Sequence, residues 1–181
     1  MVIVDNLLPQ PDAEIISENM QSVSWVYNYR SLKWKYSKTP NQINGKHWHR
    51  ACGSSQEEVS RAGFDWLLPI WLHAREKLKL ASEYNIYKFF RLYMNSHTFG
   101  TEPSRHSDDG DYTMIYYPNM EWEKEWGGGT VIKNELCDYV GNRLVLFPAS
   151  DKHQAQTVSR ECHELRSVVV FKTNTLRKSN V

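Results

Sequence analysis

The sequence predicts a mainly β protein with N-terminal helices, in which a β-sandwich or small barrel carries the helices on one outer face. Two observations lead to this fold class. From residue 86 onward, about eight short β-rich runs alternate with Gly, Pro, Asn and Asp, a rhythm typical of sandwiches and barrels. Apolar residues at helical spacing are found before that point. Because helices precede strands, we expect the helices to pack against one face of the β unit.

The first expected helix spans residues 12–20. Pro11 and Asp12 are start signals, and Ile16 and Met20 lie four residues apart, on one helical face. Over residues 24–29, aromatic residues then alternate with small or polar ones, which predicts a strand with an aromatic face.

A second helical region follows Ser55 and Glu58, whose spacing is that of a capping box. Its apolar stripe runs over Val59, Ala62, Gly63, Trp66, Leu67, Ile70, Trp71, Ala74 and Leu78. Pro69 lies inside this stripe, so we expect either a kinked helix or two consecutive helices. The stripe most plausibly covers a sheet and is assigned no catalytic role.

The β-rich runs are short and separated by turn residues. They cover residues 87–95, 104–108, 112–117, 129–133, 137–140, 143–147, 152–158 and 165–173. We therefore expect a single domain over residues 1–181, with a helical support region over about 1–85 and a β core over about 86–173.

Composition narrows the class of protein. The chain has 40% apolar and 24% charged residues and a formal charge of +1, which argues against nucleic-acid binding. The N-terminus lacks a signal-peptide pattern, and no stretch approaches the roughly 18 apolar residues of a membrane span. The three cysteines are odd in number and widely spaced, which favours a reducing compartment such as the cytoplasm. Oligomeric state is not readable from the sequence.

Three residues form a candidate metal site. His106 and Asp108 are two apart in an extended segment, so both side chains point to the same side, and His153 begins another extended run. Two imidazoles and one carboxylate make the facial triad that leaves positions open on Fe(II).

Arg166 accompanies this candidate site. It opens the apolar run RSVVVFK, and an inward-pointing guanidinium needs a buried anionic partner because it does not lose its charge. A dicarboxylic co-substrate would supply that anion, gripped at two points by the guanidinium fork.

The ordered set HSD, WGGGT, FP, H and RSVVVF resembles the prolyl-4-hydroxylase-like branch of the Fe(II)/2-oxoglutarate-dependent oxygenases. The resemblance covers roughly residues 86–173 and implies a double-stranded β-helix, or jelly-roll, core. It implies Fe(II) held by His106, Asp108 and His153, with 2-oxoglutarate and dioxygen as co-substrates and ascorbate supporting activity. The far carboxylate of 2-oxoglutarate would bind Arg166.

Further roles follow from the same resemblance. Tyr93 and Asn95 stand at family-like positions for co-substrate binding, with ordinary sheet packing as the alternative; Thr113 is a weaker candidate. The family segment GGET reads GGGT here, with Gly129 in place of the acid, which favours a more flexible loop. The interval from His153 to Arg166 is longer than in many prolyl hydroxylases.

The expected reaction is hydroxylation of an unactivated C–H bond, because halogenases of the superfamily lack the carboxylate that Asp108 provides. The expected substrate is a prolyl or other protein side chain, or alternatively a small-molecule metabolite. A non-catalytic jelly-roll binding module and a cupin-like enzyme without 2-oxoglutarate remain rival interpretations.

Other residues give weaker signals. His47, His49 and Cys52 could form a structural zinc site, although a polar strand face explains them as well. His97 could contact substrate or co-substrate. The rings of Tyr112, Tyr116, Tyr117, Trp122 and Trp126 could line a substrate groove or pack in the core. The segment NMEWEKEWGGG suits a mobile lid.

Overall fold

The computed structural model describes residues 1–29 and 46–176. The helices are α1 (Gln10–Gln21), α2 (Gln56–Arg61), α3 (Leu68–Lys77) and α4 (Leu80–Glu83), with 3-10 turns η2 (Asp65–Leu67) and η3 (Lys124–Trp126). The strands are β1 (Val2–Val4), β2 (Val26–Tyr29), β3 (His47–Gly53), β4 (Ile86–His97), β5 (Tyr112–Tyr117), β6 (Thr130–Ile132), β7 (Glu135–Cys137), β8 (Arg143–Pro148), β9 (His153–Ala155) and β10 (Arg166–Thr175).

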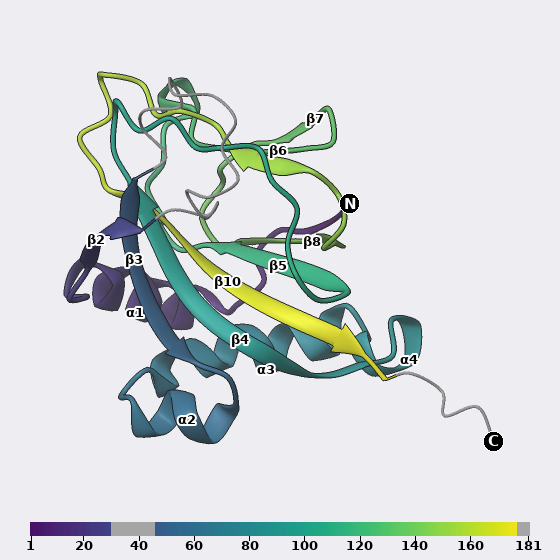
Figure 1. Ribbon diagram of the computed structural model, residues 1–181. Helices are drawn as coiled ribbons and strands as arrows, with labels where there is room; N and C mark the ends of the chain where they lie inside the picture. Colours follow the sequence, from purple (N-terminus) through teal and green to yellow (C-terminus); the bar gives the residue numbers. More distant parts are fainter. Residues whose placement is uncertain (30–45, 177–181) are drawn as a thin grey trace.

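These strands form two antiparallel sheets. The large sheet has the order β1-β8-β5-β10-β4-β3-β2, and the small sheet has the order β7-β6-β9. In Figure 1 the helices lie along one side of the large sheet, and β6 and β7 lie on its other side. The expected mainly β architecture, a jelly-roll core with helices on one sheet, is confirmed.

The large sheet therefore has two packed faces. Along β10, Val169 and Phe171 belong to the core under the helices, where the Trp71 ring lies 5.9 Å from Phe171. Val168 and Val170 belong to a second core between the two sheets. This alternation follows from the two-residue period of a strand. Burial on both faces explains why RSVVVFK reads as an almost continuous apolar run.

The helical stripe is divided before Pro69. Helix α2 ends near Gly63, whose φ of 78° lies in the left-handed region that favours glycine. Pro69 sits in the first turn of α3, where its missing N–H costs no hydrogen bond. Of the two expected alternatives, a kinked helix or consecutive helices, the structure has consecutive helices. Ser55 caps α2 by accepting from the Glu58 backbone N–H at 3.3 Å.

Two of the expected strands differ from the structure. The run 104–108 is reduced to an isolated bridge at His106. The strand expected over 137–140 lies earlier, as β7, because Lys133 adopts a φ of 57° in a tight turn that pairs β7 directly with β6.

The three cysteines are free, with Cys52 and Cys137 buried. Within the described ranges, no helix combines the length and apolar character needed to cross a membrane.

Candidate functional site

Backbone pairing brings the two candidate histidine ligands together. His106 and His153 exchange two backbone hydrogen bonds, of 2.9 and 2.8 Å, although 46 residues separate them in the chain. Strand β9, which carries His153, is held in turn by β6 through the pair Ile132–His153. The Asp108 N–H donates to the Ala149 carbonyl at 2.8 Å, which fixes the third residue on the same frame.

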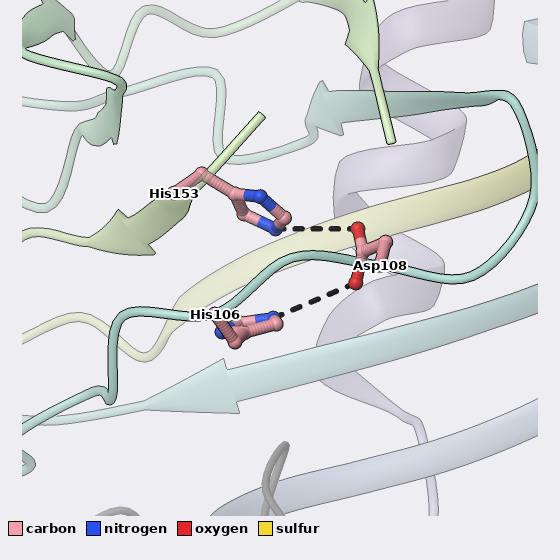
Figure 2. Close-up of side chains that lie close together, drawn as sticks. All are labelled: His106, Asp108 and His153. Atoms are coloured by element: carbon pink, nitrogen blue, oxygen red, sulfur yellow. Dashed lines mark ion pairs between the residues drawn. The ribbon is translucent and has the colours of Figure 1, made fainter. Parts of the chain in front are cut away.

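The three side chains converge on one point (Figure 2). The Asp108 Oδ1 atom lies 3.6 Å from His106 Nε2, and Oδ2 lies 3.2 Å from His153 Nε2. One ligand atom from each residue can be chosen so that all three lie within 4.8 Å of one another. His153 is buried, while His106 and Asp108 are partly buried.

Both imidazoles are oriented by a backbone carbonyl. His106 Nδ1 lies 2.8 Å from the Ser104 oxygen, and His153 Nδ1 lies 2.9 Å from the Asp151 oxygen. A carbonyl oxygen only accepts, so Nδ1 carries the proton and a neutral ring presents the lone pair of Nε2. Burial lowers the pKa of His106, which favours that neutral ring. Two imidazole lone pairs and a carboxylate facing one point fit an Fe(II) triad.

Asp108 has two further partners. Its Oδ2 accepts a hydrogen bond from Thr113 at 2.7 Å and forms an ion pair with Lys172, a residue of β10 that is only 1% exposed. Burial would raise the pKa of the Asp108 carboxyl, but the contact with His153 and the positive charge of Lys172 outweigh burial. The pKa of Asp108 therefore lies well below its usual value.

Arg166 lies at the start of β10 and points into the space between the sheets. Its Nε donates to the Gly128 carbonyl at 2.6 Å, and its guanidinium lies over the rings of Tyr117 and Tyr139 at 6.0 and 5.6 Å. Within residues 1–29 and 46–176, no Asp or Glu side chain pairs with Arg166. Arg166 is only 2% exposed, and a charge buried to this degree requires an anionic partner, which the carboxylates of the described residues do not provide.

Polar groups surround this guanidinium. Thr130 Oγ1 lies 3.4 Å from Arg166 Nη2 and accepts a hydrogen bond from the Tyr117 hydroxyl at 2.8 Å. A carboxylate bound to Arg166 would need further hydrogen-bond donors, and these two hydroxyls lie beside the guanidinium. The sequence placed Tyr117 among possible groove residues; its position two residues after Ile115, on the inward face of β5, is the signal that assigns it to this pocket.

The GGGT segment is tightly packed. A Cβ on Gly129 would lie 2.5 Å from the Cys137 carbonyl, and the Gly129 oxygen accepts from the Gln156 N–H at 2.8 Å. The expected flexibility of this loop stays a prediction. Glycine is required there because β7 runs against it.

Tyr93 and Asn95, the two residues of β4 that the sequence suggests for co-substrate binding, have different surroundings. Tyr93 lies next to the triad: burial raises its pKa well above the usual value, and the Asp108 charge adds to the effect. The Asn95 Oδ1 atom lies 2.7 Å from His49 Nδ1. His97 is buried and pairs across the strands with Arg166, so it faces the same interior.

The alternative zinc site is not assembled. His49 faces the sheet interior beside Asn95, whereas Cys52 is buried in the core under the helices. Burial raises the pKa of the Cys52 thiol to about 12, which disfavours the thiolate that zinc requires. Among the described residues, the cluster of His, Cys, Asp or Glu suited to a metal is the His106–Asp108–His153 set.

The aromatic residues proposed for a groove divide between the two cores. Tyr116 packs under the helices, and Tyr117 packs between the sheets. In the proposed lid, the Trp122 indole N–H donates to the Gly127 carbonyl at 2.9 Å, and its ring lies 4.3 Å from Tyr139. Trp126 is 6% exposed. Both tryptophans thus anchor the segment over the Arg166 end of the interior.

Thr130 was not among the residues that the sequence indicated for this site, and neither was Lys172. Lys172 lies six positions after Arg166, an even number that places both side chains on the same face of β10. Within an apolar strand, this lysine could have been singled out by the argument that was applied to Arg166.

Comparisons with known proteins agree with this geometry. The model of the 2OG-Fe(II) oxygenase superfamily matches residues 85–172. No curated protein sequence matches the chain. A prolyl hydroxylase from Trichoplax adhaerens, solved with a hypoxia inducible factor oxygen degradation domain peptide fragment, is 17% identical with a TM-score of 0.60; the match covers 96% of this chain and 83% of that one.

Two further solved structures share the fold. A prolyl-4-hydroxylase from Pseudomonas putida is 15% identical with a TM-score of 0.60, over 96% of this chain and 91% of its own. The viral collagen prolyl hydroxylase of Paramecium Bursaria Chlorella virus-1, in its 2OG complex, is 12% identical with a TM-score of 0.61, over 97% and 96%. At these sequence identities, the similarity to the solved structures shows a shared fold.

Residues 85–172, which hold the triad and Arg166, match the 2OG-Fe(II) oxygenase superfamily, and the solved prolyl hydroxylases share the fold. The chain is an Fe(II)- and 2-oxoglutarate-dependent oxygenase.

Proposed function

We propose that this oxygenase hydroxylates an unactivated C–H bond, with His106, Asp108 and His153 as the iron ligands and Arg166 as the anchor of 2-oxoglutarate. One observation carries the proposal. The triad and the buried Arg166 guanidinium, which pairs with no carboxylate among the described residues, face the same interior between the sheets. A dicarboxylate that reaches from metal to Arg166 satisfies both needs.

Each residue has a stated task in this proposal. His106 and His153 present Nε2 because their Nδ1 protons are held by backbone carbonyls. Arg166, together with Tyr117 and Thr130, binds the far carboxylate of 2-oxoglutarate. Iron, when bound, supplies the oxygen chemistry that couples decarboxylation of 2-oxoglutarate to succinate with oxidation of the substrate.

Tyr93 and Asn95 complete the proposed site. The Tyr93 ring lies 5.9 Å from the Lys172 ammonium, which pairs with Asp108. Asn95 is engaged with His49, so a co-substrate contact by Asn95 would need an exchange of that hydrogen bond.

For the substrate, we propose a prolyl or other protein side chain, with a small-molecule metabolite as the alternative. The superfamily and the shared fold support an oxygenase in either case. The presence of Asp108 as a third protein ligand favours hydroxylation over halogenation.

The direct test is succinate formation. Purified protein with Fe(II), ascorbate and 2-oxoglutarate should release succinate slowly without added substrate, and Asp108→Ala should abolish this release. Asp109→Ala is the matched control, because Asp109 is exposed and pairs with Arg91 instead. Unchanged turnover in Asp108→Ala would overturn the assignment.

We also propose a reducing compartment, such as the cytoplasm, as the location of the protein. Three free cysteines, two of them buried, support this proposal.

A further inference from the structure

Lys172 introduces a second buried cation into the interior between the sheets. Its Nζ forms an ion pair with Asp108 and lies 3.2 Å from Thr113 Oγ1. Strand pairing places Lys172 directly opposite Thr113 on β5, so both side chains face the triad. Lysine is almost never fully buried unless it is paired. The proposed function gives this ammonium no task.

Asp108 is the carboxylate that pairs with Lys172, and the other nearby carboxylates have different partners. Asp109 pairs with Arg91, and Asp151 pairs with Lys133. Each of these acids therefore has a cation of its own. Residues 30–45 and 177–181 contain no Asp or Glu, so their side chains cannot supply a carboxylate either.

The charges of the loaded site can then be compared. The two positive charges of Fe(II) and the one of Arg166 are balanced by the single negative charge of Asp108 and the two of 2-oxoglutarate, with the histidines as neutral ligands. Lys172 leaves one positive charge in excess. An uncompensated charge in a buried site is costly, and an anion that enters the site relieves this cost.

Asp108 also becomes a weaker partner for Lys172 once it binds a dication. In the structure, the same oxygen, Oδ2, faces His153, Thr113 and Lys172. A bound dication would attract the same Asp108 carboxylate charge that now pairs with the Lys172 ammonium.

We propose that the substrate carries a carboxylate close to the C–H bond that is oxidised, and that Lys172 is the specificity-determining residue that selects this charge. The inference rests on the proposed function and narrows its substrate class. Two sources provide the same chemistry: a free amino or organic acid, and an acidic side chain beside the target residue of a peptide.

The test uses matched probes that differ in one charge. Anaerobic protein loaded with Fe(II) and 2-oxoglutarate is titrated calorimetrically with acetate against acetamide, and with N-acetyl-L-proline against N-acetyl-L-prolinamide. The peptide arm compares blocked Glu-Pro-Glu with blocked Gln-Pro-Gln. We expect the anionic member of at least one pair to bind about tenfold more tightly, as a charged hydrogen bond provides. A preference seen with acetate or N-acetyl-L-proline indicates a free acid, and a preference seen with blocked Glu-Pro-Glu indicates a peptide.

Variants assign the preference to Lys172. Lys172→Gln keeps a hydrogen-bond donor without the charge, and the preference should fall to within about twofold. Lys172→Met serves as a second neutral variant if Lys172→Gln does not fold, and Lys172→Arg should retain the preference. Lys133→Met, which removes an exposed lysine, is the matched control.

Binding of Fe(II) and of 2-oxoglutarate is measured first in every variant. If the wild type binds neither Fe(II) nor 2-oxoglutarate, the proposed function itself is contradicted. Retained binding without preference for any anionic probe, or a preference unchanged in the neutral Lys172 variants, would overturn only the present inference.

Discussion

His106 and His153 donate a backbone hydrogen bond to each other, His106 to the His153 carbonyl at 2.9 Å and His153 to the His106 carbonyl at 2.8 Å. The two imidazole centres lie 4.5 Å apart as a result. This pairing sets the distance between the two candidate imidazole ligands through the backbone, so their geometry does not depend on side-chain contacts alone.

Removal of one imidazole should therefore weaken metal binding strongly. We expect His153→Ala to lower the affinity for Fe(II) or Mn(II) by more than about 100-fold and to abolish succinate formation, since loss of a ligand exceeds the 10–100-fold typical of a supporting residue. Calorimetric titration with Mn(II) measures the affinity. His163→Ala is the control, because His163 contacts Trp126 outside the triad. Equal metal affinity in both variants would contradict the ligand assignment.

Arg166→Ala should separate co-substrate binding from metal binding. Without the guanidinium, we expect the affinity for 2-oxoglutarate to fall by about 100-fold, roughly 2.7 kcal/mol, and the affinity for Mn(II) to change by less than about threefold. Both are measured by calorimetry on folded protein. Arg143→Ala, which removes a guanidinium paired with Asp5 in another part of the fold, should leave both unchanged. A parallel loss of metal would indicate a structural role for Arg166.

Stability should depend on pH through His97. Burial, aided by the Arg166 charge, lowers the pKa of His97 well below its usual 6.5. Below that pH the unfolded chain binds a proton that the native ring does not, so stability present above pH 6.5 is lost as pH falls, by at most about 1.4 kcal/mol per pH unit. Urea denaturation between pH 7.5 and 5.5 measures this slope.

The slope should become shallower in His97→Leu. His73→Leu, on α3, is the control for loss of a histidine outside the interior. If His97→Leu retains the full slope of the wild type, another group is responsible for the acid sensitivity.

Gly129→Ala should destabilise the fold. Its Cβ would meet the Cys137 carbonyl at 2.5 Å, and relief of such a contact requires β7 to shift, which costs about 1–3 kcal/mol. Gly63→Ala is the comparison, because a Cβ there meets no atom within 4 Å and only its left-handed backbone is penalised, by about 1 kcal/mol. The free energy of unfolding in urea measures both. If the free energy of unfolding falls less in Gly129→Ala than in Gly63→Ala, β7 can shift at little cost in stability.

Local patterns predicted much of this molecule. The β-rich runs YTMIYY and RSVVVFK each predict a buried strand, and β5 and β10 lie where these runs indicate. The order of the motifs predicted that His106, Asp108 and His153 form a metal set with Arg166 as a co-substrate anchor, and the three candidate ligands do lie together. The boundary errors, at 104–108 and 137–140, are in segments where a turn or a single bridge replaces a strand.

What the sequence by itself determined is the set of candidate ligand residues and the positions of the main strands, because both are local patterns. Only the tertiary structure decided which of them meet. Cys52 lies away from His49 because strand residues an odd number of positions apart face opposite sides of the sheet. Tyr117 comes close to Arg166 through the pairing between β5 and β10. Lys172 was placed on Asp108 in the same way. Such contacts depend on strand register between distant segments, which local periodicity does not specify.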